Sequence, residues 1–207
     1  VLTTDFVDGV GFDAFLALDP DRATRDRIGN ALFEFYIGSL FAHGVYNCDP
    51  HPGNILFLDG GRVAMLDHGC TREFEAPFVA KLANLTRAVH ADEPHRLHRA
   101  LVGLGIVREG RRYDEALIRG FLRSFFGPML DDRVREVDLA SAMELREVAK
   151  KKRQLMRFAL PGEFLFLFRI RFGLMSVLAR LGARANWYRL EKRCVDEFAA
   201  AHPLLAS

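Results

Sequence analysis

The sequence has few cysteines and no cysteine motif. Only three of its 207 residues are cysteine, Cys48, Cys70 and Cys194, and no two of them have C-x-x-C spacing. A disulfide framework needs an even set of cysteines, and a structural zinc site needs closely spaced ligands. We therefore expect neither, and we expect a protein of a reducing compartment.

The sequence also lacks an excess of one charge. It has 29 basic and 27 acidic residues, which give a formal net charge of +2. A strongly basic chain would indicate a nucleic-acid partner, and this composition predicts none. Half of the residues are hydrophobic and 27% are charged, which is typical of a globular protein.

No apolar run is long and free of charge. The most apolar stretch, residues 163–182, contains Arg169, Arg171 and Arg180. A membrane span needs about 20 predominantly apolar residues. We interpret the stretch as a buried helix whose arginines are directed at partners or solvent. No signal peptide is recognisable, so we expect a cytoplasmic protein, and the start at Val1 suggests a piece of something longer.

The remaining pattern is mainly helical with one small β-hairpin, an α+β class, and the length suits one domain. We expect a strand over Val1–Phe6 and then a loop containing Gly9 and Gly11. Apolar periodicity and breaks at Gly and Pro predict helices over Asp21–His43, Ala76–His90, Pro94–Leu104, Glu115–Phe126, Leu139–Phe158, Glu163–Leu181 and Trp187–Ala200.

The hairpin is predicted over residues 55–66. Its strands are Ile55–Leu58 and Arg62–Leu66, and Asp59-Gly60-Gly61 forms the turn between them. Depending on register, Asn54 lies opposite Leu66 or Asp67. Because adjacent strands lie about 5 Å apart, the amide of Asn54 and the carboxylate of Asp67 meet at the open end of the hairpin.

A third polar residue precedes the hairpin. Asp49 lies five residues before Asn54, in a loop stiffened by Pro50 and Pro52 and made flexible by Gly53. This loop can fold Asp49 back toward the open end. Carboxylate and amide oxygens suit Mg²⁺, which also takes phosphate oxygens of a substrate. Such a clamp is what phosphoryl transfer requires.

The order of these residues is that of a kinase catalytic loop followed by a metal-binding turn. In that scheme Asp49 orients or deprotonates the attacking hydroxyl, and Asn54 and Asp67 hold the metal. Gly69 lets the chain turn away tightly after the last ligand.

The spelling of these motifs resembles the UbiB/AarF family of atypical, protein-kinase-like proteins. "DPHPGNILF" (49–57) and "VAMLDHG" (63–69) carry the resemblance. "VLTTDFVDGV" (1–10) is similar to the strand and hinge that precede the catalytic loop, and residues 160–187 are similar to the C-terminal helices of the family.

The resemblance implies a protein-kinase-like C-terminal lobe. Residues 1–10 would be the hinge strand, 45–70 the catalytic loop, hairpin and metal-binding turn, and 73–207 a helical subdomain. ATP and Mg²⁺ would be the cofactors, and the activity would be an atypical kinase or ATPase linked to ubiquinone or other prenyl-lipid metabolism.

The resemblance also assigns residues around the nucleotide. Asp5, Phe6 and Val7 would form the hinge against the adenine. His51 would shape the catalytic loop and contact phosphate or substrate.

The sequence departs from the family pattern at two positions. Asn47 stands where the family usually has His, and His68 stands where Phe is usual. The 207 residues also contain no glycine- or alanine-rich phosphate loop, strand lysine, helical glutamate or KxGQ segment. We therefore expect the large lobe alone, with the N-terminal kinase lobe missing from this chain.

Other readings stay open at this point. The chain could be a small-molecule phosphotransferase of the aminoglycoside or choline kinase kind, or a pseudokinase-like module that binds nucleotide or lipid without turnover. Phe164–Phe172 could be helix core or line a groove for an isoprenoid tail. Cys48 and Cys70 could be buried apolar residues or form a regulatory disulfide.

A basic run is the candidate membrane contact. Lys150, Lys151, Lys152 and Arg153 are either a solvated helix end or a contact with a prenyl lipid or an anionic membrane surface.

Overall fold

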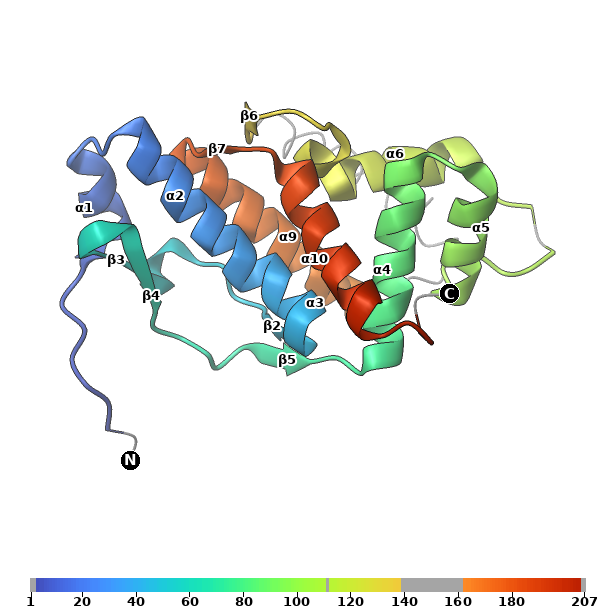
Figure 1. Cartoon of the computed structure of the whole chain (residues 1–207), viewed down its shortest axis with the longest axis horizontal. Helices are drawn as coiled ribbons and strands as arrows, with labels where there is room; N and C mark the ends of the chain where they lie inside the picture. The colour runs from blue at the N-terminus through green and yellow to red at the C-terminus, as the bar shows by residue number, and fades with distance from the viewer. Residues whose placement is uncertain (1–2, 111, 139–161, 206–207) are drawn as a thin grey trace.

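The computed structural model describes residues 3–110, 112–138 and 162–205 (Figure 1). The helices are α1 (Phe12–Ala17), α2 (Arg22–Phe33), α3 (Ser39–His43), α4 (Ala76–Ala91), α5 (Pro94–Gly103), α6 (Glu115–Phe126), α9 (Gly162–Leu181) and α10 (Trp187–Ala201). The strands are β1 (Val10–Gly11), β2 (Val45–Asn47), β3 (Ile55–Leu58), β4 (Arg62–Met65), β5 (Thr71–Glu73), β6 (Arg135–Glu136) and β7 (Arg184–Ala185).

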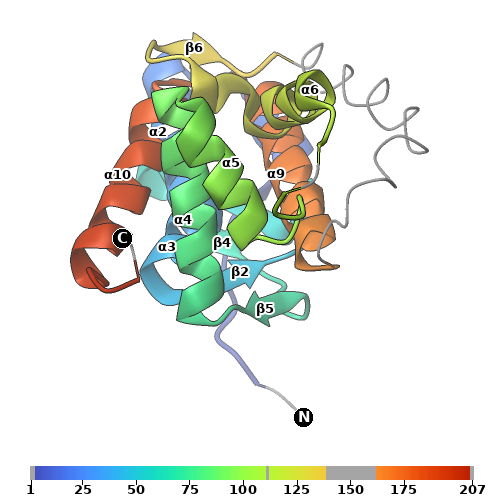
Figure 2. The same ribbon diagram turned by 90° about the vertical axis from the view of Figure 1, so that its right-hand side faces the viewer.

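The long helices form the body of the molecule. α2 packs against α9, and α3 packs against α10. The hairpin of α4 and α5 lies with α6 at one end, and α1 lies with β3 and β4 at the other (Figures 1 and 2). The predicted helices that fall on described residues are confirmed to within one or two residues at each end, apart from an internal change in the first helix.

Helix α2, the start of the helix predicted over Asp21–His43, leads into the candidate site. Asp21 caps it by accepting a hydrogen bond from Thr24 N–H at 2.7 Å, and Ile28 and Leu32 are fully buried. Between α2 and α3 the chain forms a π-helical segment, Glu34–Gly38, which the periodicity did not predict. Gly44 ends α3 with φ of 66°, a left-handed conformation that favours glycine.

The hairpin is confirmed and its register is settled. β3 and β4 are antiparallel with Leu58 opposite Arg62 and Ile55 opposite Met65. The next pair is Asn54 and Leu66, because Leu66 N–H donates to the Asn54 carbonyl at 2.9 Å. Of the two predicted registers, the structure therefore has the one that leaves Asp67 one residue beyond Asn54.

A second pair of strands was not predicted. β2 is antiparallel to β5, with Asn47 opposite Thr71. These strands have three residues each, too few for a periodicity of two to appear in the sequence. They fasten together the entrance of the catalytic loop and the exit of the metal-binding turn, which frames the candidate site.

The predicted strand at Val1–Phe6 is wrong for the residues described there. Residues 3–6 have no regular structure, and the side chain of Phe6 is 92% exposed. The strand lies instead at β1, where Val10 pairs with Phe57 of β3, so Gly11 belongs to the strand and does not follow it. A strand forms where a neighbouring strand completes its backbone hydrogen bonds, and backbone pairing with β3 begins only at Val10.

Two expectations fall outside the described residues. They are the helix predicted over 139–158 and the basic run at 150–153. Within the described ranges, no helix combines the length and apolar character needed to cross a bilayer.

Candidate active site

Asp49 and Asn54 lie together at the open end of the hairpin. Asn54 closes a short 3₁₀ turn, Pro52–Asn54, just before β3. Its Nδ2 donates a hydrogen bond to Asp49 Oδ2 at 3.1 Å. The loop between the two residues therefore folds back on itself, as its prolines and glycine predicted.

Asn47 joins the catalytic loop to the metal-binding turn. Its Oδ1 accepts a hydrogen bond from Asp49 N–H at 3.0 Å, and its Nδ2 donates to the carbonyl oxygen of Asp67 at 2.8 Å. The side chain is buried, with 5% of its surface exposed. One amide thus fixes the backbone at both aspartates, at a position that the sequence marked only as a departure from the family pattern.

Asp67 is held by the turn that follows it. Its Oδ1 accepts a hydrogen bond from Gly69 N–H at 2.7 Å. A Cβ at Gly69 would lie 3.0 Å from that same oxygen, tighter than most real contacts, so glycine suits the close approach. The carboxylate is exposed, and its Oδ2 takes no part in this turn.

The donor set fits a magnesium ion shared with a phosphate. Asn54 donates through Nδ2 to Asp49, so its Oδ1 is the atom that could bind a metal. Asp67 accepts from Gly69 N–H through Oδ1, so its Oδ2 could bind the same ion. Among the described residues, no three His, Cys, Asp or Glu side chains are grouped closely enough to hold a metal. Mg²⁺ does not require such a cage, since it takes one or two protein carboxylates, waters and substrate phosphates.

His51 shapes the loop from within. Its Nδ1 accepts a hydrogen bond from Gly53 N–H at 3.0 Å, and the backbone N–H of His51 donates to the Asp49 carbonyl at 2.7 Å. The imidazole is exposed beside the loop. This geometry supports the loop-shaping role proposed for His51 and leaves contact with phosphate as a prediction.

Helix α9 supports the catalytic loop from 120 residues further along the chain. Arg169 donates a hydrogen bond from a guanidinium nitrogen to Asp49 Oδ1 at 3.1 Å. One turn later, a Cβ at Gly173 would lie 2.3 Å from Pro50 Cγ, so the proline ring rests directly on the helix backbone. One turn earlier, Phe166 lies 4.6 Å beneath the guanidinium carbon of Arg72 in β5. These spacings put all three α9 residues on one face.

The π-helical segment brings two aromatic residues to the site. Phe35 meets the ring of His68 edge-on, with centroids 6.3 Å apart. Tyr36 is fully buried, and its hydroxyl has no hydrogen-bond partner among the described residues. Burial, and secondarily the charge of Asp49, raises the pKa of Tyr36. π-Helical turns occur often at functional sites, and this one lies behind both aspartates.

The predicted hinge residues are not brought to this site. Asp5, Phe6 and Val7 lie on an N-terminal segment that leaves the body of the molecule (Figure 1). Phe6 is almost fully exposed, and no secondary structure holds the segment. Their contact with adenine stays a prediction.

The cysteines predicted to be near each other are neighbours. Cys48 N–H donates to the Cys70 carbonyl at 3.0 Å, and both thiols are free. Burial raises the pKa of the Cys48 thiol. The buried-apolar reading therefore fits Cys48, whereas Cys70 is exposed.

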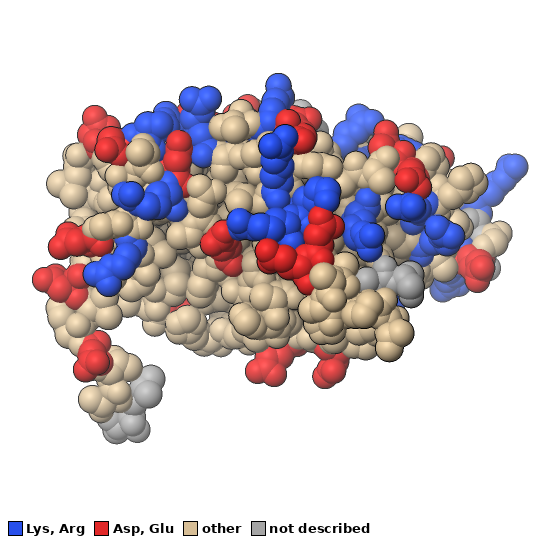
Figure 3. Space-filling model, in the orientation of Figure 1, with Lys and Arg blue, Asp and Glu red and all other residues tan. Residues whose placement is uncertain are grey.

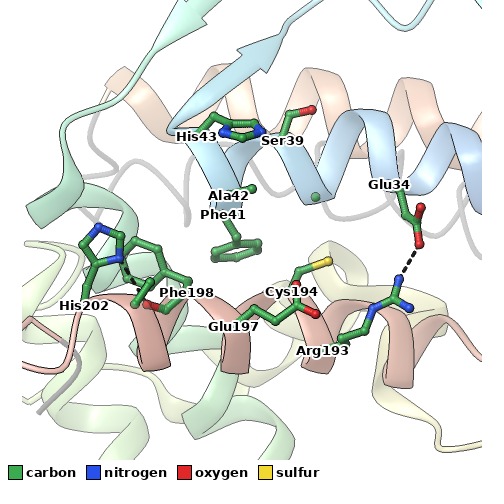
Figure 4. A pocket seen from close by; sticks show the side chains of 12 residues that line it. Glu34, Ser39, Phe41, Ala42, His43, Arg193, Cys194, Glu197, Phe198 and His202 are labelled. Atoms are coloured by element: carbon green, nitrogen blue, oxygen red, sulfur yellow. Dashed lines mark hydrogen bonds and ion pairs between the residues drawn. The ribbon is translucent and has the colours of Figure 1, made fainter.

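A separate pocket of about 420 Å³ lies between α3 and α10 (Figure 4). Phe41 of α3 and Phe198 of α10 line it, and Glu34, in the π-helical segment before α3, forms an ion pair with Arg193 of α10. Burial raises the pKa of Cys194, which lines it, to about 11, so that thiol is protonated at neutral pH. Neither the catalytic loop nor the metal-binding turn contributes to this pocket.

Sequence reasoning missed two residues of the site, Asn47 and Arg169. The signal for Arg169 was weak, because an arginine in an apolar helix can pair with an acceptor or reach solvent, and 62% of the Arg169 side chain is exposed. All three arginines of the stretch have one: Arg169 pairs with Asp49, Arg171 with Glu191, and Arg180 with Asp13. The sequence left partners and solvent both open for these arginines, and only the fold shows their partners.

The fold places this chain in the class of kinase-like proteins, as a mainly helical large lobe with a small β-hairpin. The profile of the ABC1 atypical kinase-like domain matches residues 1–100. A solved structure, the complex of Rv3197 with erythromycin from Mycobacterium tuberculosis, superposes with a TM-score of 0.72 at 20% identity, over 94% of this chain and 49% of that one.

Curated relatives give the family. The chain is 31% identical over 178 residues to Protein ACTIVITY OF BC1 COMPLEX KINASE 8, chloroplastic, of Arabidopsis thaliana, and this match covers 79% of the chain. It is 23% identical over 199 residues to the probable serine/threonine-protein kinase abkD of Dictyostelium discoideum, which covers 93% of this chain. The chain belongs to the ABC1 family, the UbiB/AarF group of atypical kinase-like proteins. It spans only 23% and 28% of those two relatives.

Proposed function

We propose that this chain forms the large lobe of an ATP-dependent atypical kinase or ATPase. The observation that carries the proposal is that Asn54 bonds to the Asp49 carboxylate, while the side chain of Asn47 joins the backbone N–H of Asp49 to the backbone carbonyl of Asp67. Turn chemistry alone accounts for an isolated Asp or Asn. It does not account for three such residues, from two loops, tied together at the open end of one hairpin.

Asp49 is the group that acts on the acceptor. The hydroxyl of an acceptor, or a water molecule, attacks the γ-phosphorus of ATP. The new O–P bond forms as the bond from phosphorus to the β–γ bridging oxygen breaks, and ADP leaves. Asp49 orients the attacking oxygen and accepts its proton. Arg169 and Asn54 each bind one Asp49 oxygen and so restrict the rotation of the carboxylate.

Asn54 and Asp67 would hold Mg²⁺ through the oxygens that the structure leaves for it. The bound ion would neutralise charge on the phosphates. The chain itself contributes the positioning, because the β2–β5 ladder and the amide of Asn47 fix the backbone on either side of the two ligands.

The acceptor is proposed from the family, with a prenyl-lipid or ubiquinone precursor as the first candidate. A small-molecule phosphotransferase is the second, since the structure of similar fold from M. tuberculosis is a complex with erythromycin. The third candidate has no acceptor at all: it is a nucleotide- or lipid-binding module without turnover. The residues of the site do not separate the three, because each uses the same phosphate-binding end of the hairpin.

Two variants of the full-length protein test the proposal. Asp67→Ala should abolish Mg²⁺-dependent ATP binding, measured by calorimetry. Asp49→Ala should retain that binding and lose ATP hydrolysis by about 100-fold or more, since general acid–base catalysis contributes about that much. Asp59→Ala, in the turn at the far end of the same hairpin, is the matched control.

The outcomes separate the candidates. ATP binding without hydrolysis in the parent protein would favour the binding module. Hydrolysis that rises with an aminoglycoside- or choline-like acceptor would favour the small-molecule phosphotransferase. Equal binding by the parent and Asp67→Ala would remove the metal assignment altogether.

A further inference from the structure

A groove lined by basic side chains lies between α4 and α5, apart from the candidate active site. Its volume is about 530 Å³, within the range of small-molecule sites. Figure 3 shows Lys and Arg side chains over the end of the molecule where these two helices lie. The lining residues are Lys81, Asn84, Arg87, Ala88, Arg96, Arg99, Ala100 and Gly103.

The spacing of these residues explains the groove. Lys81, Asn84 and Ala88 follow one face of α4, and Arg96, Arg99 and Gly103 follow one face of α5. The small residues leave open space between the helices, and the long cationic side chains project along its edges. No residue of the lining is acidic.

The charges in the groove are only partly neutralised by the protein. Arg96 pairs with Glu93 at 2.9 Å. Within the described part of the chain, no carboxylate lies within ion-pair distance of Lys81 or Arg99, and both residues are exposed. Like charges on facing helices repel each other, so an anion bound between them would stabilise this arrangement.

The surroundings favour a compact, water-soluble anion. A membrane-binding surface combines basic residues with apolar side chains that enter the bilayer. The large exposed apolar residues among those described are Phe6, Val7, Val10, Leu18, Leu66, Val134, Leu204 and Leu205, and none of them belongs to α4 or α5. A concave site with guanidinium groups on its walls instead suits phosphate, which Arg binds through paired hydrogen bonds.

We propose that the α4–α5 groove binds a small soluble anion that carries two or more phosphate groups. Lys81 and Arg99 are its principal contacts, with Arg87 and Arg96 beside them. The site is independent of the proposed phosphoryl transfer, because it shares no residue with the catalytic loop or the metal-binding turn.

Calorimetric titration of the full-length protein with inorganic tripolyphosphate tests this site. EDTA is present throughout, so that binding through Mg²⁺ at the hairpin does not contribute. We expect one site per chain and an affinity that falls as salt rises. Lys81→Gln with Arg99→Gln should raise the dissociation constant about tenfold or more, since charge-assisted hydrogen bonds are lost. Asp67→Ala should bind as the parent does.

A charge-matched variant makes the test specific. Arg123→Gln with Arg133→Gln removes two positive charges from exposed positions outside the groove and should leave the dissociation constant nearly unchanged. Equal loss in both double variants would show diffuse attraction and overturn the proposal. Absence of tripolyphosphate binding, with sedimentation on phosphatidylglycerol vesicles that depends on Lys81 and Arg99, would overturn it in favour of a membrane surface.

Discussion

At the scale of single residues, Asn47 determines how the two halves of the site are held. It stands where the resemblance to the family led us to expect histidine, and its amide makes two hydrogen bonds at once, one to each loop. An amide offers both a donor and an acceptor, so this one side chain links the two loops. The sequence indicated a departure here, whereas the structure shows a connecting residue.

Asn47→Ala should weaken both the fold and the activity. The substitution removes the hydrogen-bond partners of the Asp49 N–H and the Asp67 carbonyl, both only partly buried, and each lost bond costs about 0.5–1.5 kcal/mol of unfolding free energy. Urea unfolding measures that loss, and ATP hydrolysis should fall in the protein that remains folded. Asn30→Ala, which removes one bond from Asn30 to the Asp26 carbonyl on α2, is the control and should lose stability alone. Equal activity in the two variants would contradict the connecting role.

Arg169 should act through the orientation of Asp49. Arg169→Ala removes the guanidinium from one carboxylate oxygen, and misplacement of a catalytic group by about 1 Å can cost about 100-fold in rate. Because 62% of the Arg169 side chain is exposed, free guanidinium should reach the site and restore part of the hydrolysis. Sodium chloride at equal ionic strength should not restore it.

Arg180→Ala is the control on the same helix, because Arg180 pairs with Asp13 and not with the catalytic loop. Its hydrolysis should match the parent. An Arg169→Ala variant with full activity, or one that guanidinium leaves unchanged, would show that the ion pair does not position Asp49.

At the scale of elements, α9 was predicted as a helix, but its function was not. Its apolar residues and the breaks at either end indicated a buried helix, and this is what forms. The face that carries Phe166, Arg169 and Gly173 could not be assigned from sequence, because its partners lie about 100 residues away along the chain. Periodicity identifies a face and does not identify what covers it.

Gly173→Ala should displace the catalytic loop. The new Cβ would lie 2.3 Å from Pro50 Cγ, and neither a helix backbone nor a proline ring moves easily. We expect unchanged helix content by circular dichroism with hydrolysis reduced about tenfold or more, since catalytic geometry tolerates little displacement. Gly120→Ala in α6, where a Cβ meets nothing within 4 Å, should retain activity and gain about 0.5–1 kcal/mol of stability. Normal hydrolysis by Gly173→Ala would show that the loop does not depend on this contact.

At the scale of the whole molecule, a buried charge cluster holds three helices together. Glu191 of α10 contacts Arg171 of α9, and its Oε2 lies 3.4 Å from His90 Nε2 of α4. Arg171 also lies over the rings of Phe125 and Phe126 in α6, at 4.6 and 4.8 Å. The cluster therefore joins the helices that support the catalytic loop to the end of the molecule that carries the basic groove.

Glu191→Gln should destabilise the fold and change its pH dependence. Burial pushes the pKa of Glu191 upward, but Arg171 and His90 outweigh burial, so the pKa lies below its ordinary value of 4.5. A lowered pKa in the folded state means that the stabilisation is present above pH 4.5 and is lost as the pH falls further. Breaking a buried pair costs about 3–5 kcal/mol.

Urea unfolding from pH 7 downward measures this effect. The parent should lose stability below pH 4.5 more steeply than Glu191→Gln, which has no carboxylate to protonate. The double variant Arg171→Met with Glu191→Leu should cost less than the two single changes together, since it leaves no unpaired charge at either position. Identical pH profiles for the parent and Glu191→Gln would contradict the lowered pKa.

The sequence predicted those parts of the fold that depend on local order. The helices from α2 onward, the turn at Asp59-Gly60-Gly61 and the return of Asp49 toward Asn54 all follow from residues near each other in the chain, whereas α1 lies where a loop was predicted. The short strands β2 and β5 and the π-helical segment did not, because pairing and packing with distant residues decide them. The same is true of Arg169, whose partner is 120 residues away.

The support of the catalytic loop by α9 also sets the order in which the site can be completed during synthesis. Asp49 leaves the ribosome 120 residues before Arg169, a delay of about 6–24 s at about 5–20 residues per second. Throughout that interval the hairpin can form, but Pro50 has no helix to rest on. The nascent protein therefore acquires the contacts that orient Asp49 only after α9 has been made, well after the hairpin itself can form.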